Sequence, residues 1–164
     1  MAASGTGFWL LRRGDYHRSE LGGECQGERV PRSRPGAAQR LGLSEGLSVL
    51  GCDGDGNFFY NSLTSNGNDY WCNVYKSDDG GNSWTMGTYS QGGDKQWMSI
   101  DRSSGIGGGN IYEFWNASFS ICYPYNFTRS TDENSSYESC SSIPGDPYWG
   151  TTFVTPEGVL YTCG

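Results

Sequence analysis

The sequence lacks the residue pattern of a metal-binding protein. It contains one histidine, His17, and none of its six cysteines form a Cys-x-x-Cys pair, whereas zinc sites draw on such pairs and on clustered histidines. Asp53 and Asp55 resemble the start of a calcium loop, but the twelve-residue spacing that ends on a glutamate is absent. We therefore expect no metal site and no cofactor, and interpret both aspartates as turn residues.

Long apolar runs are also missing. No stretch approaches the roughly 20 residues that a membrane-spanning helix requires. The best candidate near the N-terminus, residues 8–11, is followed at once by Arg12 and Arg13, whereas a secretory signal needs about 7–15 apolar residues. The sequence predicts no membrane span, and no signal peptide is visible in it.

Helix-forming residues are scarce after residue 50. Alanine, leucine, glutamate and lysine favour helices. The chain instead holds 26 glycines, and aromatics make up 15% of its 164 residues, while hydrophobic residues of all kinds reach only 35%. Aromatic residues favour strands and glycine favours turns, so the composition predicts an all-β protein of short strands joined by many turns.

Positive charge is scarce in the main part of the chain. Residues 45–164 hold four basic and fourteen acidic residues, whereas residues 1–44 hold seven arginines, no lysine and four acidic residues. Nucleic-acid binding needs clustered lysine and arginine, so we expect no nucleic-acid partner. Residues 1–45 show neither strand alternation nor a helical stripe. They are either a disordered basic tail or a segment whose reading frame or gene start is wrongly assigned.

Two short segments repeat 53 residues apart. Residues 75–85 read YKSDDGGNSWT, and residues 129–138 read RSTDENSSYE. The matching positions are Ser77, Asp79, Ser83 and Trp84 in the first copy, and Ser130, Asp132, Ser136 and Tyr137 in the second. Asn134 replaces Gly81, and asparagine tolerates the left-handed backbone conformation. Small polar residues with glycine favour tight turns, so each copy predicts the tip of a β-hairpin.

A second element repeats with similar spacing. Residues 54–62, 107–115 and 156–164 each run from a turn through a glycine into an apolar-x-Tyr segment or a close variant, and Gly56, Gly109 and Gly158 lie 53 and 49 residues apart. The predicted strands are 47–52, 57–63, 71–77 and 84–90, then 97–101, 110–117, 125–130 and 137–143, with a third unit beginning near residue 148. Four-stranded units that repeat about every 40–50 residues are typical of β-propeller blades. A β-sandwich is the alternative, but it does not explain the constant spacing.

The pattern Ser-x-Asp-x-Gly-x-x-Trp at residues 77–84 resembles the Asp box of the sialidase-like, BNR-repeat propellers, and residues 130–137 resemble a degenerate copy. The segments 92–101 and 148–161 also resemble parts of secreted bacterial BNR proteins. The resemblance implies an all-β, sialidase-like β-propeller fragment of about two and a quarter four-stranded blades over residues 46–164, preceded by an irregular tail.

The resemblance assigns the box residues a structural role. In the family the box lies between the third and fourth strands of a blade, on the side opposite the catalytic face. The Asp79 carboxylate is expected to accept hydrogen bonds from its own turn, and Trp84 to pack as a wedge beneath the hairpin. The residues implied are Ser77, Asp79, Gly81, Trp84, Ser130, Asp132 and Tyr137.

The resemblance further implies a fragment of a secreted sialidase- or glycosyl-hydrolase-like protein that is inactive alone. Sialidases of this fold use an arginine cluster, a Tyr–Glu pair and an aspartate acid/base, whereas residues 46–164 offer only Arg102 and Arg129. The alternative is a non-catalytic propeller module that binds protein or carbohydrate. A photosystem-assembly propeller is a third interpretation, which the cysteine content disfavours. The expected partners are glycans or the remaining propeller blades.

The candidate catalytic residue is Asp94, chosen from the carboxylates Asp94, Asp101, Glu113 and Asp146. It follows a glycine-rich loop and leads into a predicted inner strand. The functional interpretation is an acid/base or a ligand contact. The structural alternative is a turn or capping aspartate beside the solvated Lys95.

The cysteines predict one disulfide. Cys122 and Cys140 flank the second predicted turn on neighbouring antiparallel strands, which lie within the Cα separation of about 4.4–6.8 Å that a disulfide needs. Cys52, Cys72 and Cys163 have no assigned partner. Six cysteines in a chain of this length favour an oxidising, secreted or cell-surface location.

Three Asn-x-Ser/Thr sequons begin at Asn116, Asn126 and Asn134. They would be glycosylated only in a eukaryotic secretory pathway. In a stretch so rich in asparagine and serine they can also arise by chance.

Overall fold

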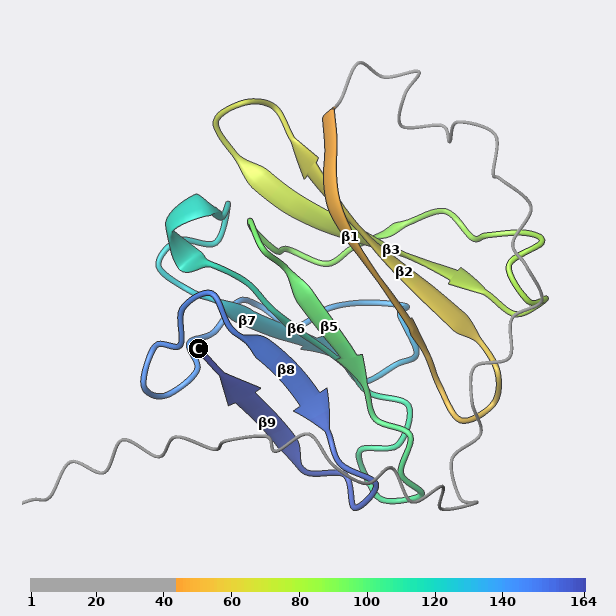
Figure 1. Cartoon of the computed structure of the whole chain (residues 1–164). Helices are drawn as coiled ribbons and strands as arrows, with labels where there is room; N and C mark the ends of the chain where they lie inside the picture. Colours follow the sequence, from red (N-terminus) through yellow and green to blue (C-terminus); the bar gives the residue numbers. More distant parts are fainter. Residues whose placement is uncertain (1–43) are drawn as a thin grey trace, which may run out of the picture.

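The structure, a computed structural model, describes residues 44–164, in which short antiparallel strands are joined by turns and loops and there is almost no helix (Figure 1). The expected irregular tail, residues 1–45, lies outside the described residues except for its last two positions. Within residues 44–164 the only helix is the 3₁₀ turn η2 (Ala117–Phe119). The prediction of an all-β protein is confirmed.

The strands of this part of the chain form three sheets in chain order. The first sheet contains β1 (Ser44–Cys52), β2 (Phe58–Ser65), β3 (Tyr70–Ser77) and β4 (Thr88–Tyr89), the second contains β5 (Trp97–Ile100), β6 (Ile111–Phe114) and β7 (Phe127–Ser130), and the third contains β8 (Thr151–Val154) and β9 (Leu160–Cys163). Every pair of neighbouring strands is antiparallel and consecutive in sequence. Each sheet is therefore a simple meander of hairpins.

The predicted fourth strands, 84–90 and 137–143, are wrong in extent. β4 has two residues, and residues 137–143 contribute one isolated bridge, between Ser141 and Phe127. Where these strands were expected to begin, a single backbone bond to the third strand is accompanied by a bond from or to a side-chain hydroxyl. The Lys76 N–H donates to Thr85 Oγ1 at 3.0 Å, and Thr128 Oγ1 donates to the Glu138 carbonyl at 2.7 Å.

The three sheets pack on one another through their first strands. β1 contacts β5, and β5 contacts β8. The core between the first two sheets contains Val49, Phe59, Val74, Met98, Ile100, Ile111 and Tyr137. Gly51 makes this approach possible, because a Cβ there would lie 3.0 Å from Ile100 Cδ1. Between the second and third sheets, Ser99 Oγ donates to the Thr152 carbonyl at 2.8 Å.

In each hairpin that opens a sheet, a glycine with a left-handed backbone lies two residues before the second strand. Gly56, Gly109 and Gly158 have φ values of 88°, 83° and 80°. These left-handed values favour glycine, which has no Cβ to clash with the backbone. The repeated glycine of the sequence thus marks a repeated backbone turn. Asp53 belongs to the first of these turns, where its Oδ1 accepts the N–H groups of Asp55 and Asn57, both at 2.9 Å.

Candidate functional site

The strand registers define two opposite ends of the sheets. Ile100, Ile111 and Ser130 pair side by side at one end of the second sheet, and the first sheet has the same arrangement around Ser77. Both repeated turns leave from this end, which we name the turn end. The loops that precede β5 and β8, residues 90–96 and 144–150, lie at the other end, and we name them the leading loops.

Asp79 organises the first repeated turn. Its Oδ1 accepts hydrogen bonds from Ser77 Oγ at 2.8 Å and from the Ser83 N–H at 2.9 Å, and its Oδ2 accepts one from Ser83 Oγ at 2.7 Å. Ser77 Oγ in turn accepts the Gly81 N–H at 2.8 Å. The bonds from Ser83, followed by that from Ser77, lower the pKa of Asp79 to about 2, because they stabilise its charged form.

The second repeated turn contains the same four bonds. Asp132 Oδ1 accepts Ser130 Oγ at 2.8 Å and the Ser136 N–H at 2.9 Å, its Oδ2 accepts Ser136 Oγ at 2.6 Å, and Ser130 Oγ accepts the Asn134 N–H at 3.0 Å. The pKa of Asp132 is lowered as well, chiefly by the bonds from Ser136. A copy that is degenerate in sequence thus forms the full network.

The aromatic residues that close the two turns differ in burial. Trp84 remains 41% exposed, although its Nε1 donates to the Gly81 carbonyl at 3.2 Å and its ring packs edge-on against Tyr60 at 6.2 Å. The expected wedge beneath the hairpin is therefore incomplete, because the described residues leave this face of the first sheet open. Tyr137 instead packs against the core between the first two sheets, and its hydroxyl donates to Asn134 Oδ1 at 2.9 Å.

The second turn also contacts the first sheet. Asn134 Nδ2 donates to the Val74 carbonyl at 2.9 Å, Thr88 Oγ1 donates to the Asn134 carbonyl at 2.7 Å, and Lys76 Nζ pairs with the Glu133 carboxylate at 3.1 Å. Glu133 and Asn134 have φ values of 55° and 77°, at the positions that Gly80 and Gly81 hold in the first turn. Asparagine at the second position therefore joins two sheets, a role that the sequence pattern did not reveal.

The leading loops share a backbone conformation that sequence reasoning missed. Positive φ values occur at Gln91, Gly92 and Lys95 (65°, 95° and 55°) and, 54 residues later, at Gly145, Asp146 and Trp149 (87°, 45° and 59°). A bulky residue such as tryptophan adopts this conformation only where its surroundings hold it there. Here Lys95 Nζ lies 5.5 Å from the centroid of the Trp149 ring, and Tyr148 packs edge-on against that ring at 5.1 Å. The two loops therefore meet at this point.

Asp94 lies in the first leading loop and is half-buried. Its Oδ1 accepts the Lys95 N–H at 2.9 Å, which is the contact expected of a turn aspartate. Asp146 lies in the second leading loop, where its Oδ1 accepts Asn126 Nδ2 at 3.3 Å. Arg102 directly follows β5 and so lies at the turn end. The structure thus brings Asp94 and Asp146 to one end and places Arg102 at the other.

Exposed aromatic side chains gather around the leading loops. The loop 115–126 lies at the same end, because it joins the paired residues Phe114 and Phe127, and the Asp94 N–H donates to the Phe119 carbonyl at 2.8 Å. We name this surface the aromatic end. It consists of Trp97, Phe119, Tyr123, Tyr125, Tyr148 and Trp149, all of them exposed.

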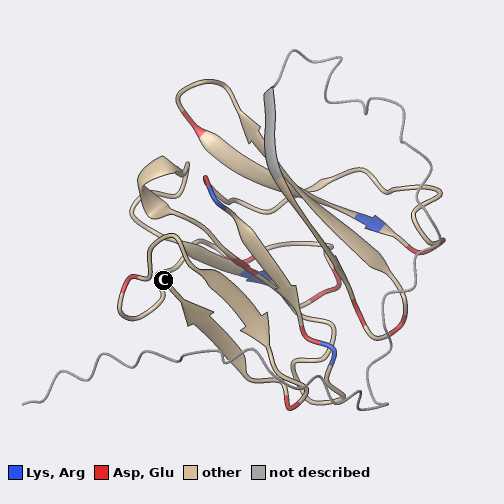
Figure 2. Ribbon diagram, in the orientation of Figure 1, with Lys and Arg blue, Asp and Glu red and all other residues tan. Residues whose placement is uncertain are grey.

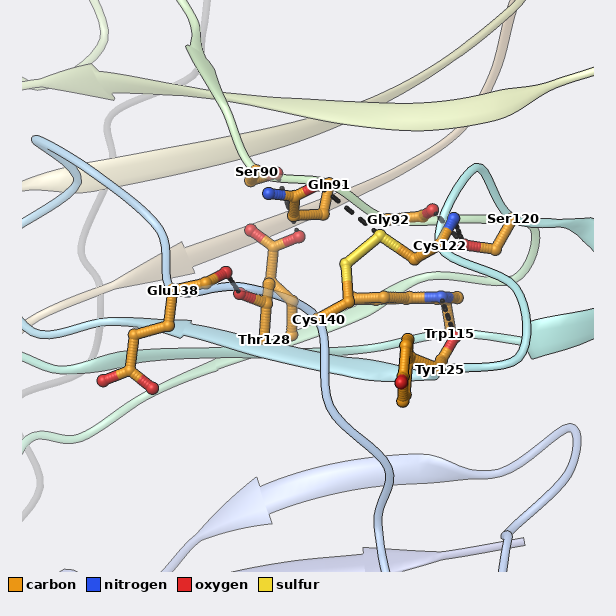
Figure 3. The surroundings of a disulfide bond; sticks show 11 residues. Ser90, Gln91, Gly92, Trp115, Ser120, Cys122, Tyr125, Thr128, Glu138 and Cys140 are labelled. Carbon is orange, nitrogen blue, oxygen red and sulfur yellow. Dashed lines mark hydrogen bonds between the residues drawn. A yellow bond between two sulfur atoms is a disulfide. The ribbon is translucent and has the colours of Figure 1, made fainter.

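A disulfide fixes the loop of the aromatic end (Figure 3). Cys122 and Cys140 are bonded with a Cα–Cα distance of 6.2 Å, so the predicted pairing is confirmed. The Cys122 N–H donates to Ser120 Oγ at 2.9 Å, and Ser120 Oγ donates to the Gly92 carbonyl at 2.6 Å. The disulfide ties loop 115–126 to the segment after the second repeated turn, and the bond from Ser120 ties the loop to the first leading loop. Cys52 is disulfide-bonded too, whereas Cys72 and Cys163 are free.

Most acidic residues of the described part lie in loops (Figure 2), but Glu113 lies on β6 and is fully buried between the first two sheets. Its Oε2 accepts Ser90 Oγ at 3.0 Å. Burial raises the pKa of Glu113 to about 8, against the smaller opposing effects of Ser90, Asn61 and Tyr137. The carboxyl is therefore neutral at pH 7. Asp101 follows Ile100 at the turn end and is buried, and Glu113 lies one residue from the aromatic end but is completely buried, which leaves Asp94 and Asp146 as the accessible candidates.

The asparagines of all three sequons, Asn116, Asn126 and Asn134, are buried. Asn126 and Asn134 also donate their Nδ2 atoms, to which a glycan would attach, to Asp146 and to the Val74 carbonyl. The folded chain therefore has no room for an N-linked glycan at these positions.

No cluster of three metal-ligating side chains occurs among residues 44–164, and no helix in this range could cross a membrane. Comparisons with protein-family models, curated proteins and solved structures returned no match.

Proposed function

We propose that this chain is part of a sialidase-like, BNR-repeat β-propeller and that it binds glycans at its aromatic end. The observation that carries the proposal is the recurrence of one hydrogen-bond network in two turns 53 residues apart. In each network one aspartate accepts bonds from two serine hydroxyls and one serine N–H, and the first serine hydroxyl accepts a further backbone N–H. Equivalent donor–acceptor distances in the two turns differ by at most 0.2 Å. Each turn follows the third strand of its sheet, which is where the family has its Asp box.

The packing of the sheets supports the same proposal. Three meanders follow one another in the chain and contact one another through their first strands, β1, β5 and β8. In a propeller the first strand of each blade lines the central axis, and the blades follow in chain order. The described residues would then supply two blades and the inner strands of a third.

The aromatic end has the composition of a carbohydrate-binding surface. Exposed rings such as those of Trp97 and Trp149 offer flat apolar faces to the C–H groups of a sugar. Asp94 and Lys95 lie beside them and can bond hydroxyl groups, which is the mixture of apolar lining and few polar groups found in ligand sites. Binding is favoured over hydrolysis by this chain alone, because Arg102 lies at the opposite end.

A second candidate is a protein-binding module. It is favoured by loop 115–126, in which Phe119, Ile121, Tyr123 and Tyr125 are all exposed. Clustered exposed aromatics are also typical of protein interfaces. For either function the disulfide between Cys122 and Cys140 favours a secreted or cell-surface location.

The test is a glycan-array screen of the purified, disulfide-bonded chain, followed by titration with sialyllactose and with neutral oligosaccharides. We expect binding that Trp149→Ala weakens at least tenfold. The control is Met86→Ala, because Met86 is a highly exposed residue of the segment after the first repeated turn. The proposal fails if no glycan binds, or if Trp149→Ala and Met86→Ala bind equally well.

A further inference from the structure

Among residues 44–164, the first sheet has one face that the second sheet covers and one face that no other sheet covers. Val49, Asn61 and Val74 pair side by side and face the second sheet, and the latter two are fully buried. Residues one position away point to the other face, because side chains alternate along a strand. The row on that face is Leu50, Tyr60 and Tyr75, with Trp84 against Tyr60. Leu50 is 59% exposed, so part of this row lies open.

The open row has a buried equivalent in the next sheet. Met98, Glu113 and Thr128 pair side by side in the second sheet, at the positions that Leu50, Tyr60 and Tyr75 hold in the first. All three are buried, and Glu113 accepts the bond from Ser90, which lies just after β4 of the first sheet. The row Met98, Glu113 and Thr128 is therefore covered by the first sheet, whereas the equivalent row of the first sheet is partly exposed.

The third sheet has the complementary uncovered face. Phe59, Tyr112 and Tyr161 each lie three residues after the repeated glycine. Phe59 faces the second sheet and is 1% exposed, Tyr112 is 9% exposed, and Tyr161 is 61% exposed. Phe153 pairs with Tyr161 and is equally exposed. This face contacts the following sheet in the first and second sheets. In the third sheet the described residues leave the same face exposed.

We propose that the open faces of the first and third sheets bind each other between two copies of this chain, head to tail. The two faces are the two halves of a contact that already occurs inside the chain, so the contact between copies continues an existing type of interface. The rows that meet are Leu50, Tyr60 and Tyr75 on one copy, and Phe153 and Tyr161 on the other, and none of these residues is charged. Burying exposed apolar side chains is the driving force.

The arrangement is heterologous, because each copy uses a different surface for each of its two contacts. Two copies related in this way close a ring when the rotation permits and otherwise extend into longer assemblies. The inference rests on the sheet repeat of the proposed propeller and not on glycan binding. The two open faces are sheet surfaces, separate from the leading loops, so association and glycan binding fail independently.

The test uses sedimentation velocity and light scattering on the purified chain over a range of concentrations. The wild-type chain is expected to associate as concentration rises. Leu50→Arg and Phe153→Arg are each expected to remain monomeric, because each breaks one of the two faces. The control Ile106→Arg, at a fully exposed position in the turn before β6, is expected to associate like the wild type.

Mixing the two variants tests the head-to-tail geometry. Leu50→Arg keeps the third-sheet face intact, and Phe153→Arg keeps the first-sheet face intact. An equimolar mixture is therefore expected to form a heterodimer through these two faces. Leu50→Ser and Phe153→Ser serve the same purpose if the arginine variants do not fold, as judged by circular dichroism. A wild-type chain that stays monomeric at every soluble concentration overturns the proposal. A mixture that stays monomeric also overturns the proposal. So does association of the Leu50→Arg and Phe153→Arg variants, each measured alone, at the wild-type level.

Discussion

Ser90 and Glu113 meet across the contact between the first two sheets, where Ser90 Oγ donates to Glu113 Oε2 at 3.0 Å. Both residues are completely buried. The neighbouring groups come from several elements: Asn61 on β2, Cys72 on β3 and Tyr137 after the second turn. None of these neighbours is basic, so nothing in this group offsets a negative charge on Glu113.

The first prediction is that the chain loses stability as pH rises. The folded pKa of Glu113, about 8, lies above its ordinary value of 4.5. The unfolded chain therefore releases the proton first, and the stabilisation is complete below about pH 4.5 and lost between there and about pH 8. The full loss amounts to about 5 kcal/mol, since each unit of pKa difference corresponds to about 1.4 kcal/mol.

Urea unfolding at about pH 5 and about pH 8 measures this effect. Glu113→Gln keeps the shape of the side chain and should remove most of the pH dependence. Glu157→Gln, an exposed control in the hairpin between β8 and β9, should retain it. A wild-type chain that is more stable at about pH 8 than at about pH 5 would contradict the buried, neutral carboxyl.

The second prediction is that restoring the Asp-box glycine destabilises the protein. Asn134→Gly removes two hydrogen bonds, from Nδ2 to the Val74 carbonyl and from the Tyr137 hydroxyl to Oδ1. The expected loss of unfolding free energy is about 1–3 kcal/mol. The matched change Gly81→Asn should cost less, because asparagine tolerates the left-handed backbone at φ 89° better than most residues and a Cβ there meets only Trp84 at 3.8 Å. Equal effects at the two positions would mean that Asn134 does not join the sheets.

The third prediction concerns the sequons. When the chain is made in a eukaryotic secretory pathway, the folded fraction should carry no glycan on Asn116, Asn126 or Asn134, because all three are buried. Treatment with a peptide N-glycosidase should leave the mass of the folded fraction unchanged. A folded fraction that loses glycan mass from any of these asparagines would contradict the packing described.

The fourth prediction concerns the disulfide. Cys122→Ser with Cys140→Ser opens a crosslink that spans 18 residues, and the chain-entropy relation gives a stability loss of about 3 kcal/mol. The same double variant should bind glycan more weakly, because loop 115–126 then loses its covalent link to the segment after the second repeated turn and is held by hydrogen bonds alone. Thermal unfolding and glycan titration measure the two effects. Unchanged stability together with unchanged binding would show that the crosslink does not organise the aromatic end.

Much of the fold could be predicted because local chemistry determines it. Glycines, aspartates and serines at constant spacing predicted the turns, and the alternation of aromatic and β-branched residues predicted β2 and β3 to within three residues. The disulfide pairing was predicted correctly, but its cysteines were expected on neighbouring strands, whereas Cys122 lies in the turn before β7 and Cys140 lies outside any strand. The fourth strands were overestimated because the hydroxyl groups of Thr85 and Thr128 make some of the bonds that a regular ladder would form between backbones, and residue type alone does not reveal that exchange.

The site was harder to predict because tertiary contacts create it. Asn134 looked like a degenerate glycine until the structure placed it against Val74. Glu113 was one of four candidate carboxylates, and only burial separates it from Asp94. The meeting of Lys95 with Trp149 joins residues 54 positions apart in two left-handed backbone segments. No local pattern in the sequence indicates such a contact.

The most direct test is a comparison of four alanine variants in both repeated turns. Asp79→Ala and Asp132→Ala remove the carboxylates that hold the two networks, whereas Asp78→Ala and Thr131→Ala change the exposed residues that precede them. If the turns are one repeated structural element, both aspartate variants should lower the urea midpoint by similar amounts, and the two neighbouring variants should leave it unchanged. Equal sensitivity at Asp78 and Asp79, or a loss at only one of the two turns, would contradict the repeat.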